Sequence, residues 1–137
     1  MPITEGAACS YAHWLINQGH SEAVGAPTIF ISHAWRCKFS DLLDAVLSLE
    51  ETEPNPESIY LWMDMFVVNQ HKAGVYVDPT WWSTEGMVVT PLMLRNAVQR
   101  FEHTLLVLAP FEDPIALKRA WCLYEIFSTI DTKATLE

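Results

Sequence analysis

Three short runs of apolar residues alternate along the chain with longer stretches in which apolar positions recur every three or four residues. The runs cover residues 28–31, 58–63 and 103–109 and are rich in β-branched, aromatic and leucine side chains. Continuous apolar runs of this length are typical of strands that are buried on both faces of a parallel sheet. We therefore predict three parallel strands.

The segments before, between and after these runs have apolar residues at helical spacing. The four expected helices cover residues 7–18, 39–48, 91–101 and 114–130. The last two open on a capping residue followed by proline, which favours a helix start. In the second helix the apolar positions are Phe39, Leu42, Leu43, Val46 and Leu47. Helices that connect parallel strands cover both faces of the sheet, so the pattern predicts an α/β fold.

Two irregular segments complete the chain. Residues 50–57 are acidic and contain proline, which is typical of a solvated loop. Residues 69–86 have no sustained period and include a pair of tryptophans, and loops of this length are often lids or binding loops. We expect residues 1–26 to form an N-terminal helix and linker, and residues 27–137 to form one domain.

Composition narrows the class of protein. The 137 residues suffice for one hydrophobic core, and the formal net charge of −9 argues against a nucleic-acid partner. The sequence has no apolar segment of membrane-spanning length and no signal-peptide pattern, so we expect a cytoplasmic protein. Cys9, Cys37 and Cys122 are an odd number without metal-ligand spacing, which favours reduced thiols over disulfides or a bound metal.

A ligand site is expected at the carboxyl ends of the strands. Open α/β sheets bind ligands there, where the strand order reverses, which for the order 2-1-3 lies between the first and third strands. Asp64 follows the second strand, and Arg36 is the nearest cation after the first. The side chains that directly follow the first strand are Ser32, His33, Ala34 and Trp35. We treat these six residues as candidate binding residues.

The last expected helix brings a carboxylate toward this edge. At helical spacing, one face of the helix holds Trp121, Cys122, Glu125, Ser128 and Thr129. The opposite face is apolar and is expected to pack on the sheet. It holds Ala116, Ala120, Leu123, Phe127 and Ile130. In this arrangement Glu125 would lie beside an indole and a thiol, where partial desolvation raises the pKa of a carboxyl group.

Two segments resemble signatures of a known family. Residues 30–34 read Phe-Ile-Ser-His-Ala, similar to the first signature of TIR (Toll/interleukin-1 receptor) domains. Residues 120–126 read Ala-Trp-Cys-Leu-Tyr-Glu-Ile and resemble the Trp-Cys-x-x-Glu helix of the NAD-cleaving members. The resemblance implies a flavodoxin-like three-layer fold. It also implies that Glu125 is the catalytic carboxylate and that NAD is a substrate, cleaved to nicotinamide and a linear or cyclic ADP-ribose product in signalling or immune defence.

The resemblance sets a further expectation for the sheet. Members of the family continue through two more strands and helices, so we expect this sheet to lack its last strands, as in a truncated domain. An uncovered third strand would expose a pairing edge, which a partner chain or a further part of the protein would cover. The implied partners are other copies of the chain or other TIR-like domains.

The chemistry of the reaction fits these residues. Cleavage of the nicotinamide–ribose bond builds positive charge on the ribose, which a nearby carboxylate stabilises. Nicotinamide leaves without being protonated, so one carboxylate can suffice. Trp35 and Trp121 can stack on the aromatic rings of the ligand, and Arg36 is a candidate contact for the diphosphate.

Other chemistries stay open at this point. Ser32, His33 and Asp64 raise the possibility of a Ser-His-Asp hydrolase, although no Gly-x-Ser-x-Gly elbow is present. Cys122 with His33 raises that of a thiol hydrolase, although a helix-interior position does not depress a thiol pKa. Gly-x-Gly-x-x-Gly and Walker motifs are absent, which disfavours redox use of NAD and an NTPase. The main alternative is a non-catalytic TIR-like module that acts by self-association or by binding a nucleotide signal.

Overall fold

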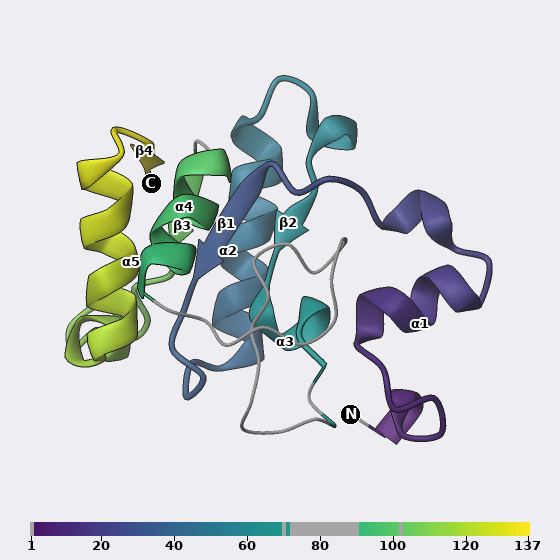
Figure 1. Cartoon of the computed structure of the whole chain (residues 1–137). Helices are drawn as coiled ribbons and strands as arrows, with labels where there is room; N and C mark the ends of the chain where they lie inside the picture. Colours follow the sequence, from purple (N-terminus) through teal and green to yellow (C-terminus); the bar gives the residue numbers. More distant parts are fainter. Residues whose placement is uncertain (1, 70, 72–90, 102) are drawn as a thin grey trace.

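The computed structural model describes residues 2–69, 71, 91–101 and 103–137 (Figure 1). Within these residues the strands form one all-parallel sheet in the order β2-β1-β3-β4. The strands are β1 (Ile29–Ser32), β2 (Leu61–Trp62), β3 (His103–Leu106) and β4 (Thr135–Leu136). The first three strands have the order 2-1-3, the order for which a ligand site is expected between the first and third strands, and their parallel pairing is as expected.

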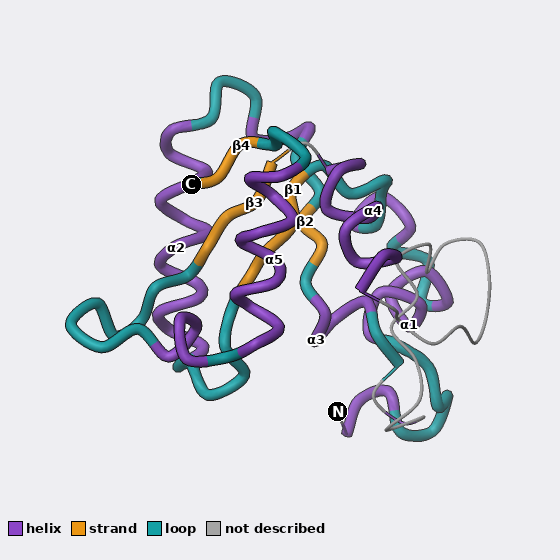
Figure 2. The backbone as a smooth tube through the Cα atoms, turned by 60° about the vertical axis from the view of Figure 1, so that its left-hand side comes forward, coloured by secondary structure: helices purple, strands orange, loops and turns teal. Residues whose placement is uncertain are grey.

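Helices cover both faces of this sheet. They are α1 (Tyr11–Asn17), α2 (Phe39–Thr52), α3 (Asp64–Val67), α4 (Pro91–Phe101) and α5 (Ala120–Asp131), and short 3-10 turns lie at Pro2–Thr4, Ser21–Ala23, Pro56–Ser58 and Ile115–Lys118. Helix α2 lies on one side of the strands, and α1, α4 and α5 lie on the other (Figure 2). The fold is therefore the expected α/β, flavodoxin-like three-layer arrangement. Among the described helices none is both long and apolar enough to cross a membrane.

The side chains of β1 alternate between two halves of the core. Ile29 and Ile31 pack on the α2 side, against buried residues that include Leu42. Phe30 points to the other side, where its ring stacks on Trp62 at a centroid distance of 5.1 Å. By this alternation Ser32 falls on the same side as Phe30. The residue that ends β1 therefore faces the layer that contains α5.

Only part of the stripe predicted for α2 faces the sheet. Leu42 is buried and Val46 packs partly buried against the same core cluster, as expected. Phe39, Leu43 and Leu47 are exposed, so for these three residues the prediction is wrong. Leu49 is buried as well, because the helix continues to Thr52, beyond its predicted end. The face of α2 that meets the sheet is therefore a narrow stripe through Leu42, Val46 and Leu49.

The orientation predicted for the last helix is also wrong. The residues expected to pack on the sheet are mostly exposed, with Leu123, Phe127 and Ile130 between 47% and 63% accessible. On the opposite face Trp121 is exposed, whereas Cys122, Ser128 and Thr129 are buried, all with small side chains. Their small side chains let α5 approach the strands closely, and the Thr129 and Thr104 hydroxyls lie 2.9 Å apart between helix and sheet.

The edge of β3 is covered within the chain itself. The last residues form β4, which pairs with β3 in parallel, and the Leu106 amide donates to the Glu137 carbonyl at 2.8 Å. The expectation of an uncovered third strand is therefore wrong. A strand of two residues is too short to leave a hydrophobic pattern in the sequence.

Several predicted boundaries shift. Strand β2 is shorter than the apolar run at residues 58–63, because the run begins with a 3-10 turn. The helix expected from residue 114 is divided into a 3-10 turn and α5. The first helix begins only at Tyr11, where the Ser10 side chain caps it by accepting from the His13 amide. The loop predicted for residues 69–86 lies outside the described residues except for positions 69 and 71.

Candidate functional site

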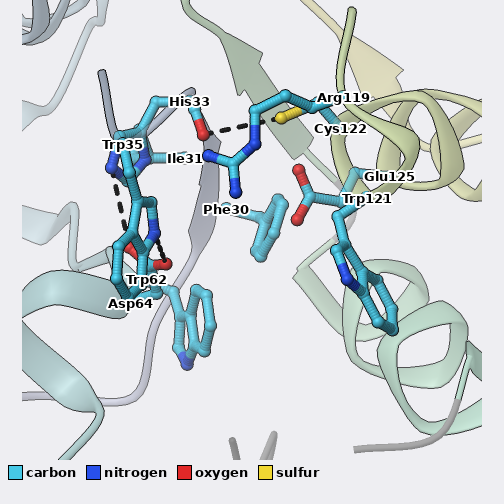
Figure 3. Close-up of a pocket in the computed structure, with 10 residues that line it drawn as sticks. All are labelled: Phe30, Ile31, His33, Trp35, Trp62, Asp64, Arg119, Trp121, Cys122 and Glu125. Carbon is cyan, nitrogen blue, oxygen red and sulfur yellow. Dashed lines mark hydrogen bonds and ion pairs between the residues drawn. The ribbon is translucent and has the colours of Figure 1, made fainter. Parts of the chain in front are cut away.

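A cavity of about 350 Å³ opens at the carboxyl ends of β1 and β2, beside the first turns of α5 (Figure 3). This volume lies at the lower end of the range of about 300–1,000 Å³ that is usual for small-molecule pockets. The cavity is lined by Phe30, Ile31, His33, Trp35, Trp62, Asp64, Arg119, Trp121, Cys122 and Glu125. It therefore lies at the carboxyl ends of the strands, as expected for an open α/β sheet, but between β1, β2 and α5 rather than between the first and third strands.

The central acid of the cavity is Glu125. The orientation of α5 points its side chain toward the sheet, where the Ser32 hydroxyl donates to Oε2 at 2.5 Å. Burial raises the pKa of Glu125 to about 7, the Ser32 hydrogen bond and the Arg119 charge oppose this rise, and the Asp64 charge adds to it. A carboxyl group with this pKa is present in both protonation states near neutral pH, which suits it to act on charge that develops in a bound ligand.

A second group of side chains forms the opposite wall. The Trp35 indole nitrogen donates to Asp64 Oδ2 at 2.6 Å, and the buried His33 places Nε2 3.6 Å from Asp64 Oδ1. The Trp35 ring itself is 62% exposed. The hydrogen bond therefore fixes an accessible aromatic surface over the end of β2, where a planar ligand group can stack.

The cation of the cavity is Arg119, the residue before α5. Its guanidinium points into the cavity, with the Glu125 carboxylate on one side and the His33 and Asp64 side chains on the other (Figure 3). With the residues that the structure describes it forms no hydrogen bond or ion pair. The sequence prediction missed this residue, because it expected one unbroken helix over residues 114–130, whereas the direction of Arg119 is set by the break between the 3-10 turn and α5.

The side-chain contacts do not assemble either hydrolase that the sequence left open. The Ser32 hydroxyl is engaged by Glu125, so it does not face His33 as a Ser-His-Asp arrangement requires. The Cys122 thiol lies 3.5 Å from the backbone carbonyl of His33 rather than from its ring. Burial raises the pKa of Cys122, and this leaves the sulfur as a thiol rather than a nucleophilic thiolate.

The candidate residues from the sequence are placed as follows. His33, Trp35, Asp64, Trp121, Cys122 and Glu125 line the cavity, and Ser32 reaches it through its bond to Glu125. Ala34 is buried beneath the site against Ala116 and Cys122, where it packs rather than faces a ligand. Arg36 is exposed and is not among the lining residues. The lining residues that the sequence reasoning did not name are Phe30, Ile31, Trp62 and Arg119.

In the part of the chain that the structure describes, no three His, Cys, Asp or Glu side chains come together as a metal site would require. Comparisons of the chain with models of known protein families, with curated proteins and with solved structures give no significant match. A functional assignment therefore depends on the geometry of the cavity and on the residues that carry the TIR resemblance.

Proposed function

We propose that the chain is a TIR-like NAD glycohydrolase or cyclase in which Glu125 is the catalytic carboxylate. The resemblance of residues 30–34 and 120–126 to TIR signatures suggests the reaction, and it suggests a cytoplasmic role in signalling or immune defence. NAD is the substrate in this proposal, and no separate cofactor is needed.

The observation that carries the proposal is the position of Glu125. Its carboxylate lies in a cavity with mainly apolar and aromatic walls, at the ligand-binding edge of an α/β sheet. A negative charge in such a partly dehydrated place stabilises a neighbouring positive charge more strongly than it would in water. Trp121 is 49% exposed at the mouth of the same cavity, so its ring is accessible to stack on nicotinamide or adenine.

The reaction then follows in two steps. The bond between the ribose C1′ atom and the nicotinamide nitrogen breaks, and its electron pair leaves with neutral nicotinamide. The positive charge that remains on the ribose is stabilised by the ionised Glu125. Addition of water to C1′ and loss of one proton give ADP-ribose, and addition of a nucleophile from the same molecule gives a cyclic product. The exposed Trp35 ring can hold an aromatic part of the substrate on the opposite wall.

The test is to follow nicotinamide release from NAD by chromatography. We expect release by the wild-type chain and a loss of at least about a hundredfold in Glu125→Gln, because removal of one electrostatic stabiliser of a transition state typically has that effect. Glu112→Gln makes the same chemical change at an exposed position outside the cavity and should retain full activity. Assembly should be recorded in parallel by light scattering. Intact NAD with folded, assembled wild-type protein would refute the enzymatic proposal, and equal activity in Glu125→Gln would refute the role of this residue.

One observation favours a second candidate, a non-catalytic module that acts by self-association. The outward face of α5 carries the exposed apolar residues Leu123, Phe127 and Ile130, and exposed apolar surface promotes association. For this candidate we expect a concentration-dependent oligomer that Phe127→Glu disperses, with NAD left intact. The matched control is Leu47→Glu, which adds the same charge to the exposed side of α2.

A further inference from the structure

The charge arrangement inside the cavity points to a class of ligand. Among the described lining residues Arg119 carries the only permanent positive charge, and it faces two acidic side chains, Asp64 and Glu125. A guanidinium beside carboxylates usually forms an ion pair with one of them, yet Arg119 pairs with none of the described residues. Its five donors are therefore available to a ligand.

The neighbouring cationic side chains are either already paired with an acid or lie outside the cavity. Arg95 on α4 is engaged by Asp131 at 2.5 Å, and Lys118 is paired with Asp113. Arg36 follows β1 but its side chain is exposed and does not line the cavity. Among the described lining residues, anion recognition thus depends on Arg119, because the other charged side chains there are the carboxylates of Asp64 and Glu125, which repel a phosphate.

We propose that Arg119 is the anion-recognition residue of the cavity and that the ligand class it selects is a nucleotide, whose phosphate binds the guanidinium while a ring stacks on the tryptophans at the mouth. A planar guanidinium matches two phosphate oxygens with two parallel hydrogen bonds, which a lysine cannot do. The inference deepens the proposed function and rests on it for the choice of a nucleotide as ligand.

Binding of this kind is linked to a proton. The Arg119 charge helps to keep Glu125 ionised, whereas burial and Asp64 act in the opposite direction. A phosphate that occupies the guanidinium cancels its charge and adds negative charge, so Glu125 takes up a fraction of a proton from solvent near pH 7. The other titratable groups that line the cavity are His33, Asp64 and Cys122, and Arg95 on the adjacent α4 is engaged by Asp131.

The experiment measures binding rather than turnover, so that it can succeed or fail independently of NAD cleavage. Isothermal titration compares ADP-ribose, AMP, adenosine and inorganic phosphate on the wild-type chain, Arg119→Gln and Arg36→Gln. We expect ADP-ribose and AMP to bind more tightly than adenosine or inorganic phosphate. Arg119→Gln should weaken AMP binding by roughly 10- to 100-fold, the usual effect of losing hydrogen bonds to a charged group, and should change adenosine binding less than about twofold. Arg36→Gln should bind like the wild type.

The proton linkage supplies a readout that a purely structural role of Arg119 would not change. Titration of ADP-ribose, whose diphosphate does not itself titrate near pH 7, in buffers of different ionisation enthalpy should report proton uptake by the wild-type chain and markedly less by Glu125→Gln, which still binds ADP-ribose. Three outcomes would overturn the inference: AMP binding no tighter than that of adenosine, an equal loss of both ligands in Arg119→Gln, or inorganic phosphate binding as tightly as AMP. Failure of NAD cleavage alongside tight AMP binding would refute the proposed reaction and leave the inference standing.

Discussion

Replacement of Glu125 by glutamine should stabilise the fold at alkaline pH. Burial raises the pKa of Glu125 to about 7, from 4.5 for an unperturbed glutamate. Between these two pH values the folded chain holds a proton that the unfolded chain has lost, so the free energy of unfolding falls as pH rises through this window. Below pH 4.5 the carboxyl is protonated in both the folded and the unfolded chain, so it does not reduce the free energy of unfolding. Above about pH 7 the full cost of burying the charge persists.

The size of the effect follows from the same two values. The interval from 4.5 to about 7 corresponds to ~3 kcal/mol at 1.36 kcal/mol for each pH unit. This is a large fraction of the ~5–15 kcal/mol by which a domain is usually stable. The glutamine in Glu125→Gln keeps an oxygen that can accept from the Ser32 hydroxyl but cannot ionise. The variant therefore removes the cost of the charge and little of the packing.

The assay is urea unfolding followed by tryptophan fluorescence at a series of pH values from about 4 to 9. We expect the two chains to have similar stability at the acid end, and Glu125→Gln to be more stable by up to ~3 kcal/mol at the alkaline end. The exposed substitution Glu112→Gln is the control and should follow the wild type throughout. If the wild type and Glu125→Gln lose stability in parallel across neutral pH, the carboxylate is not a buried acid with a raised pKa.

Three further predictions concern the site and the fold. Ser32→Ala removes the hydrogen bond that lowers the pKa of Glu125, so the pH profile of nicotinamide release should move to higher pH and activity at pH 7 should fall roughly tenfold, recovering in alkaline buffer. Leu42→Ala opens a cavity under α2 and should cost ~2–5 kcal/mol in urea unfolding, whereas the adjacent, partly exposed Leu43→Ala should cost less than ~1 kcal/mol. Deletion of residues 135–137 uncovers the edge of β3 and should produce concentration-dependent association in light scattering, which the full chain does not show to the same extent.

The central part of the fold could be predicted because its signals are local. The apolar runs at residues 28–31 and 103–109 contain β1 and β3, and the helix at residues 91–101 has the predicted bounds. The parallel pairing of the first three strands follows from the alternation of strands and helices. These features depend on patterns of a few adjacent residues, which the sequence displays directly.

The orientation of α5 could not be predicted in the same way. Helical spacing correctly grouped Cys122 and Glu125 with Ser128 and Thr129, but spacing does not say which of two opposite faces meets the sheet. The more apolar face was expected inside. The structure instead buries the face with small side chains, because they allow close approach to the strands and pair Thr129 with Thr104. The position of Arg119 was missed for a related reason, since it depends on the break that precedes α5.

Because α5 buries the Glu125 side chain, the effect of this residue on stability can be distinguished from its effect on the proposed reaction. Among the described residues Glu125 forms no ion pair, and the amide oxygen of glutamine would satisfy the Ser32 hydroxyl equally well. The ionised carboxylate costs the folded state ~3 kcal/mol above pH 7. If Glu125→Gln is more stable than the wild type but inactive, the wild-type carboxylate serves the reaction at a cost in stability, as is common in active sites. If Glu125→Gln instead loses both stability and activity, the role of Glu125 is structural, and another residue must be the catalytic one.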